Sequence, residues 1–237
     1  MQLSTPIYML KRNAKLLARQ SDIALHQALD RIAIDEGFQT WSHLSSSASG
    51  QSPVEKIVSQ LDPGDLVLLG ARPGHGKTRL GLELASNAHK LGRKGYFFTL
   101  DYHERDVADQ LSAIGTNPTP ANALPTVDTS DDVSAEHVIG RLSSNKEPAL
   151  AVIDYLQLLD QKRTNPSLED QMMMLQSYAA AEKVICVVIS QIDRSFDLAG
   201  KAMPETSDIR LPNPLDLSVF DKFFFLHNGK IQLDQAA

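Results

Sequence analysis

A glycine-rich segment that ends in a lysine and a threonine is the clearest chemical feature of this sequence. It follows an apolar run at 65–69 and precedes a helix-like run at 79–85. Backbone N–H groups of such a turn, with the N-terminus of the next helix, form a cradle for phosphates. Lys77 would then contact the β- and γ-phosphates, and the Thr78 hydroxyl would bind Mg²⁺. The predicted nucleotide-binding residues of this P-loop are Ala71, Arg72, Pro73, Gly74, His75, Gly76, Lys77 and Thr78.

Three further polar residues stand at the ends of apolar, strand-like runs. Asp154 is expected to order Mg²⁺ opposite the P-loop threonine. Asp101 is a candidate for a carboxylate that polarises the attacking water. Gln191 is a candidate for an amide that senses loss of the γ-phosphate. Each feature has a purely structural alternative. These are a helix cap for Asp154, a turn or cap for Asp101, a polar strand end for Gln191, and a glycine-rich turn with a surface lysine for the P-loop.

The elements that must position these residues alternate along the chain as in an α/β fold. The apolar runs are continuous, so the strands should be buried on both faces of a mainly parallel sheet covered by helices. Asn228-Gly229 predicts a hairpin turn between the last two strands. The expected strands are 65–69, 96–100, 150–154, 184–192, 222–226 and 230–233, and the expected helices are 79–85, 103–114, 131–144 and 168–182.

Residues 1–44 predict a small all-helical module. Thr5, Ser21 and Thr40 are expected to cap its three short helices. The first twenty residues contain no acid. The basic residues of this segment have two possible interpretations. They form either a face that is only exposed to solvent or a surface that contacts DNA or a partner protein. The bases of the first helix are Lys11, Arg12, Lys15 and Arg19.

A small, polar stretch without periodicity at 45–53 predicts a flexible linker. The predicted domains are therefore the helical module at 1–44, this linker, and an ATPase domain at 54–237. At the start of that last domain a short helix should begin at Pro53, which suits a first helical position.

Composition limits the classes of protein to be considered. The chain has 237 residues, 42% of them hydrophobic, and a formal net charge of −6. That charge argues against a protein that coats nucleic acid but permits a local basic surface. Cys186, the single cysteine, lies in an apolar run and should be a buried thiol, which favours the cytoplasm. Neither a signal peptide nor a membrane span is predicted.

Five segments together resemble the ATPase domain of DnaB-type replicative helicases, in the order of that family and at similar spacing. They are 71–78, 97–101, 152–159, 189–194 and 203–210. The resemblance implies a RecA-like P-loop NTPase fold, hydrolysis of ATP with Mg²⁺, a homo-oligomeric ring such as a hexamer, and action on single-stranded DNA. It assigns phosphate and metal to Lys77 and Thr78, Mg²⁺ to Asp154, the position of the water-activating acid to Asp101, and the phosphate sensor to Gln191.

The segment after the sensor, 192–210, suits a loop that contacts DNA phosphates. Its candidate DNA-binding residues are Arg194, Lys201 and Arg210. The alternative is a surface loop in which acids outnumber bases. The family usually has glutamate where this chain has Asp101, so slow turnover is expected. The Lys-x-Arg element of the family is not found before Ala237, which favours a second interpretation, a RecA-like ATP-dependent binding module or regulator that does not unwind DNA.

Overall fold

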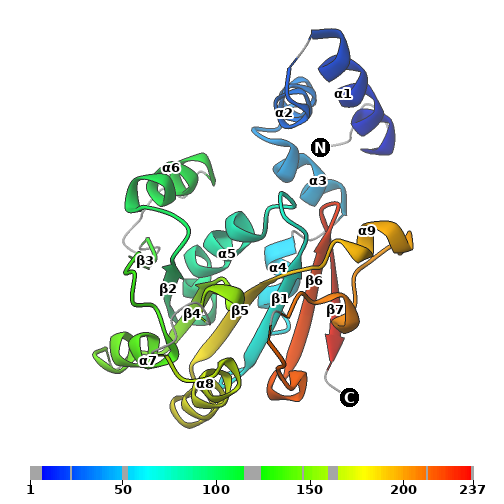
Figure 1. The fold of residues 1–237 in the computed structure, drawn as a ribbon. Helices are drawn as coiled ribbons and strands as arrows, with labels where there is room; N and C mark the ends of the chain where they lie inside the picture. The colour runs from blue at the N-terminus through cyan, green and yellow to red at the C-terminus, as the bar shows by residue number, and fades with distance from the viewer. Residues whose placement is uncertain are drawn as a thin grey trace. The chain divides into compact units, whose positions relative to one another are not determined.

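The computed structural model describes residues 7–21, 23–49, 53–114, 124–145, 147–159, 165–211 and 213–235. The chain divides into two compact units, Met1–Lys56 and Ile57–Ala237 (Figure 1). The predicted linker at 45–53 falls partly within helices, since one helix continues to Ser49 and the next begins at Pro53. Residues 50–52 lie outside the described residues.

The first unit contains helices α1 (Ile7–Ser21), α2 (Leu25–Asp35) and α3 (Trp41–Ser49), and α4 (Pro53–Val58) follows at the division between the units. Its small core is formed by Leu10, Ala33, Phe38 and Leu44.

Two of the three predicted caps of this unit can be checked. Thr40 accepts a hydrogen bond from the backbone N–H of His43 at 3.2 Å, which confirms it as the cap of α3. The predicted cap at Ser21 is wrong. No glycine or proline interrupts α1, so this helix continues through Ser21, and α2 begins after Ala24 without a side-chain cap. Thr5 lies outside the described residues.

The second unit is built on a seven-stranded sheet in the order β3-β2-β4-β5-β1-β6-β7. Every neighbouring pair is parallel except β6 and β7, which confirms the predicted mainly parallel sheet. Asn228 and Gly229 join β6 to β7 with φ of 50° and 73°, as a two-residue hairpin turn requires. The strands are β1 (Leu66–Ala71), β2 (Lys94–Thr99), β3 (Thr126–Asp128), β4 (Ala149–Asp154), β5 (Ile185–Gln191), β6 (Lys222–His227) and β7 (Lys230–Gln235).

The helices of this unit are α5 (Lys77–Ser86), α6 (Glu104–Ile114), α7 (Ala135–Ser143), α8 (Leu168–Glu182) and α9 (Ser195–Ala199). The helix predicted at 168–182 is confirmed to the residue as α8. Helix α7 begins later than the predicted residue 131, because Ser134 caps it by accepting from the N–H of His137 at 3.2 Å. Strand β3 and helix α9 were not predicted, since neither is long enough to show a periodic pattern.

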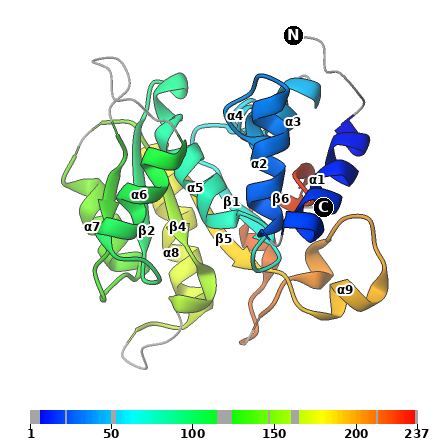
Figure 2. The ribbon, with the colours of Figure 1, turned by 90° about the horizontal axis from the view of Figure 1, so that it is seen from above.

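Helices cover both faces of the sheet (Figure 2), and successive strand residues pack against different helices. Phe97, Val152 and Ile189 face α5, where a Cβ added to Gly81 would lie 2.7–3.2 Å from their side chains. The alternate residues Phe98, Ile153 and Val188 share a buried cluster with residues of α7 and α8. Because the sheet is parallel from β3 to β6, β1, β2, β4 and β5 all end at one edge, which brings the predicted site residues together.

No helix among the described residues is both long enough and apolar enough to cross a membrane.

Candidate nucleotide-binding site

The P-loop connects the end of β1 to the first residue of α5. Ala71 is buried as the last residue of β1, and Lys77 begins α5 directly after Gly76. Gly74 and Gly76 have φ of 78° and 84°, and a Cβ added at either would meet nothing within 4 Å. These glycines therefore permit a backbone that other residues adopt poorly, beneath open space. The N–H groups in the first turn of α5 have no intrahelical acceptors, which is the backbone arrangement that a phosphate cradle needs.

A buried ion pair lies at the centre of this edge. The ammonium of Lys77 is 3.4 Å from Oδ1 of Asp154, and the two side chains are 11% and 0% exposed. Burial raises the pKa of Asp154, and this effect outweighs the lowering by the charge of Lys77 and by the Thr78 hydroxyl. The structure thus places Lys77, Thr78 and Asp154 together, as the sequence predicted.

The second oxygen of the Asp154 carboxylate, Oδ2, is buried and has no hydrogen-bond partner among the described residues. A buried carboxylate oxygen without a partner is costly, and a cation would satisfy it. Mg²⁺ prefers oxygen ligands and is commonly held by one or two protein groups together with substrate phosphates and water. Asp154 and the Thr78 hydroxyl therefore fit Mg²⁺. The described residues contain no cluster of three or more His, Cys, Asp or Glu that could hold a metal ion.

Tyr155 is a site residue that the sequence did not predict. The ammonium of Lys77 lies 4.5 Å from the centre of its ring, which is cation–π distance. Its pKa is raised, first by burial and then by the carboxylates of Asp101 and Asp154. Tyr155 follows Asp154 directly, but the sequence held no signal that its ring would cover the P-loop lysine.

Asp101 lies two residues beyond the end of β2 and is exposed. Its backbone N–H donates to Oγ1 of Thr99 at 3.2 Å, a contact that fixes the turn after the strand. Its carboxylate contributes to the raised pKa of both Asp154 and Tyr155, so it belongs to the same electrostatic environment. This position suits the predicted water-activating role. The turn that begins at Thr99 fixes where Asp101 lies.

Gln191 ends β5 directly beside Ala71 of β1 in the sheet register. Arg210 donates from its guanidinium to the Gln191 side-chain oxygen at 3.4 Å and from its backbone N–H to the Gln191 carbonyl at 2.8 Å. Gln157, not predicted as a site residue, donates to the Ser190 hydroxyl at 2.9 Å and to the Arg210 carbonyl at 2.6 Å. The predicted sensor is therefore joined to the end of the following segment.

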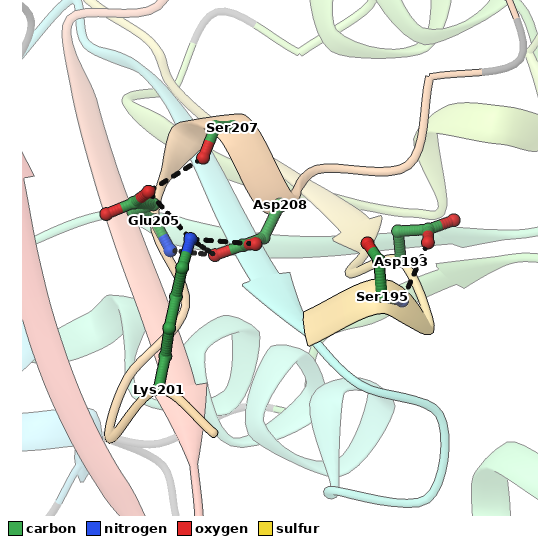
Figure 3. A network of polar contacts seen from close by, with 6 residues as sticks. All are labelled: Asp193, Ser195, Lys201, Glu205, Ser207 and Asp208. Carbon is green, nitrogen blue, oxygen red and sulfur yellow. Dashed lines mark hydrogen bonds and ion pairs between the residues drawn. The ribbon is translucent and has the colours of Figure 1, made fainter. Parts of the chain in front are cut away.

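The segment 192–210 returns to the sheet edge from which it leaves. Ile192 and Ile209 form an antiparallel bridge, and the N–H of Asp193 donates to the carbonyl of Asp208 at 2.8 Å. Between these ends Lys201 contacts the carboxylates of Glu205 at 2.7 Å and Asp208 at 3.1 Å (Figure 3). These hydrogen bonds raise the pKa of Lys201.

The three predicted DNA-binding cations therefore differ in their surroundings. Lys201 is held by two carboxylates, and Arg210 contacts Gln191. Arg194 is exposed at the start of α9.

A group of aromatic rings that includes a residue of the P-loop was also not predicted. The ring of His75 stacks on that of His227 at the end of β6, with centroids 5.0 Å apart. Phe196 of α9 meets His227 edge-on at the same centroid distance, 5.0 Å. His227 thereby contacts both the P-loop, through His75, and α9, through Phe196.

Comparison with known proteins finds similarity to the same family that the sequence motifs resemble. Residues 47–121 match the family model of the DnaB-like helicase C-terminal domain. The replicative DNA helicase DnaB of Leifsonia xyli subsp. xyli is 25% identical over 214 residues, which cover 76% of this chain and 47% of that protein. For DnaB of Mycoplasma genitalium the identity is 26%, with coverage of 78% and 47%. DnaB of Haemophilus influenzae is 22% identical, and the match covers 90% of this chain and 52% of that protein. The chain spans about half the length of these relatives.

Solved structures share the fold. A solved ATPase domain superposes with a TM-score of 0.55 at 19% identity, covering 71% of each chain. A DnaB-like replicative helicase, solved in a study of its interactions with primase, superposes with a TM-score of 0.58 at 18% identity. That match covers 97% of this chain and 71% of the other. The predicted RecA-like fold is therefore confirmed.

Proposed function

We propose, from the relationship of this chain to the ATPase domain of DnaB-type replicative helicases, that it is a Mg²⁺-dependent ATPase that acts on single-stranded DNA as a cytoplasmic ring of subunits. The observation that carries the proposal is the meeting of Lys77, Thr78 and Asp154 at the P-loop. A lysine paired with a buried strand-end aspartate, beneath an open glycine turn, is the arrangement that binding of a metal–triphosphate complex needs.

Each residue has a role that its position supports. Lys77 binds the β- and γ-phosphates, and it exchanges part of its contact with Asp154 for them. Asp154 and Thr78 hold Mg²⁺, which when bound offsets charge on the phosphates. Asp101 orients and polarises the attacking water from the exposed end of β2. Gln191 transmits loss of the γ-phosphate to Arg210 through the hydrogen bond between their side chains.

Contact with DNA is assigned to the segment 192–210. Arg194 is the readiest of its three cations because it is exposed. Lys201 would have to leave Glu205 and Asp208 before it could bind a phosphate, and Arg210 would have to leave Gln191. Several subunits in a ring would multiply these few cations into an effective phosphate-binding surface.

One observation favours a second function, an ATP-dependent binding module or regulator that does not unwind DNA. Two of the three candidate DNA-binding cations already have intramolecular partners. In this case the nucleotide would change assembly or binding of a partner, and the N-terminal helices would contact that partner protein or DNA.

Hydrolysis of ATP by wild type and Lys77→Ala, with and without single-stranded DNA, tests the proposal. Lys77→Ala should abolish hydrolysis and weaken nucleotide binding, because it removes the side-chain cation aimed at the phosphates. Lys90→Ala, an exposed lysine after α5, is the matched control and should hydrolyse ATP normally. Unchanged turnover in Lys77→Ala would remove the basis of the ATPase assignment. Mass measurement with a non-hydrolysable analogue separates ring assembly from hydrolysis.

A further inference from the structure

Helix α1 carries a one-sided stripe of positive charge outside the ATPase unit. Its sequence contains four bases and no acid. At about 100° per residue, all four bases fall within an arc of about 100° of the helix surface. The buried residues Leu10 and Ala14 lie outside this arc and face the small core. The cationic stripe of α1 consists of Lys11, Arg12, Lys15 and Arg19.

None of the four side chains forms an ion pair or hydrogen bond with another residue in the part of the chain that the structure describes. Arg12, Lys15 and Arg19 are exposed, and Lys11 is half-buried. Like charges four residues apart, such as Lys11 with Lys15 and Lys15 with Arg19, destabilise a helix. The arrangement thus works against the stability of α1, and a negatively charged partner would reverse that effect.

We propose that the cationic stripe of α1 binds the phosphodiester backbone of nucleic acid, as a contact separate from the segment 192–210. Lys11, Lys15 and Arg19 follow one another at a rise of about 6 Å, so the stripe is about 12 Å long. Measured along the axis of a duplex, one strand has about one phosphate per 3.4 Å, which is about three to four phosphates over that length. The cationic stripe and a strand of the same length therefore carry similar numbers of opposite charges.

The composition of the stripe favours nucleic acid over an acidic protein. Protein interfaces have an apolar core in which aromatic residues are enriched and charged ones depleted, whereas the stripe is charged along its whole length. Phosphate contacts also need no base-specific groups, and Lys and Arg at a helix surface are the usual donors. The binding is thus expected to be independent of sequence and sensitive to salt.

The test is fluorescence anisotropy of labelled single-stranded and double-stranded oligonucleotides across a salt series, with the full chain and without nucleotide. Each phosphate contact contributes about −0.7 to the slope of log K against log salt for single strands and about −0.9 for duplex. The triple variant Arg12→Ala/Lys15→Ala/Arg19→Ala should reduce the magnitude of the slope by about 2 on single strands. The same three contacts should reduce the magnitude of the slope by about 2.7 on duplex, so the preferred ligand is identified by the larger loss of affinity in the variant at equal salt and not by the larger change of slope.

Two controls keep the result interpretable. Lys90→Ala/Arg105→Ala/Lys230→Ala removes three exposed cations from the other unit and should leave the slope unchanged. Alanine favours helix, and the triple variant in α1 relieves like-charge repulsion, so its unfolding temperature should equal or exceed that of wild type.

The inference does not depend on ATP hydrolysis, since Lys77→Ala should keep the contribution of α1 to binding. Equal slopes for wild type and the α1 variant would overturn it. It would also be overturned if polyglutamate, but neither oligonucleotide, bound wild type and bound the α1 variant more weakly, because that result would assign the stripe to an acidic protein.

Discussion

The guanidinium of Arg72, in the P-loop, is clamped by the carboxylate of Asp197 in α9. Nε lies 3.2 and 3.1 Å from the two carboxylate oxygens, Nη2 lies 2.6 Å from Oδ2, and Nη1 donates to the carbonyl of Ile192 at 2.9 Å. The geometry is the two-pronged arginine–carboxylate contact, which gives direction as well as attraction. It joins the loop proposed to bind phosphates to the segment proposed to bind DNA.

Removal of this contact should uncouple the two regions. We expect Asp197→Ala to retain basal ATP hydrolysis and to lose most of the stimulation by single-stranded DNA, since Arg72 would no longer follow movement of α9. ATPase assays with increasing DNA measure this. Leu198→Ala, which removes an exposed side chain from the same helix, is the control. Full stimulation of Asp197→Ala would show that the pair does not transmit the signal.

Asp154 should make the nucleotide-free protein less stable as the pH rises. Its pKa is raised above the ordinary 3.8, chiefly by burial, so the folded state binds this proton more tightly than the unfolded state does. Below pH 3.8 both states are protonated and there is no cost. As the pH rises from 3.8 through the raised pKa, folding increasingly buries an ionised carboxylate and stability falls.

Urea unfolding of wild type and Asp154→Asn between about pH 4 and 8 checks this. As the pH rises, the unfolding free energy of Asp154→Asn should increase relative to that of wild type. The variant should also need more Mg²⁺ for hydrolysis. Asp216→Asn is the control, because backbone and side-chain hydrogen bonds with Ser218 lower the pKa of Asp216 below 3.8, so its difference in unfolding free energy should stay nearly constant over this pH range. A pH-independent difference for Asp154→Asn, or an unchanged Mg²⁺ requirement, would contradict the assigned role.

Asp101 should limit the chemical step. Aspartate is one methylene shorter than glutamate, which withdraws the carboxylate by about 1.5 Å. A misplacement of about 1 Å can cost on the order of 10²-fold in rate. Asp101→Glu should therefore accelerate single-turnover hydrolysis, and the exposed position of Asp101 leaves room for the longer side chain. A flat or lower rate in a folded variant would show that Asp101 is not the base or that the pocket suits the shorter acid.

The cations of the segment 192–210 should contribute unequally to DNA binding. Arg194→Ala is expected to weaken binding and to reduce the magnitude of the salt slope by about 0.7 for each phosphate that Arg194 neutralises. Lys201→Ala should have a smaller effect, because Glu205 and Asp208 already neutralise this ammonium. Fluorescence anisotropy with single-stranded DNA, with and without ATP analogue, compares the two. Wild-type affinity and slope in the double variant Arg194→Ala/Lys201→Ala would remove this segment from the DNA-binding surface.

The sequence by itself determined the local and periodic parts of this protein. The glycine turn with Lys77 and Thr78, the apolar strands, the hairpin at Asn228-Gly229 and helix α8 all lie where the pattern predicted. The strand-end residues Asp154 and Gln191 could be placed at one edge because parallel strands end on the same side of a sheet. These features depend on residues near one another in the chain, or on one general rule of topology.

Tertiary structure alone decided the contacts between distant segments. The pairing of Arg72 with Asp197, the stacking of His75 on His227 and the link from Gln157 to Arg210 join residues between 53 and 152 positions apart. No periodicity encodes them, because each depends on the strand order and on how the segment 192–210 returns to the sheet. For the same reason, the sequence could not show which of the cations Arg194, Lys201 and Arg210 are exposed and which already have a partner. A charged residue in a sequence does not reveal which polar group the fold will bring beside it.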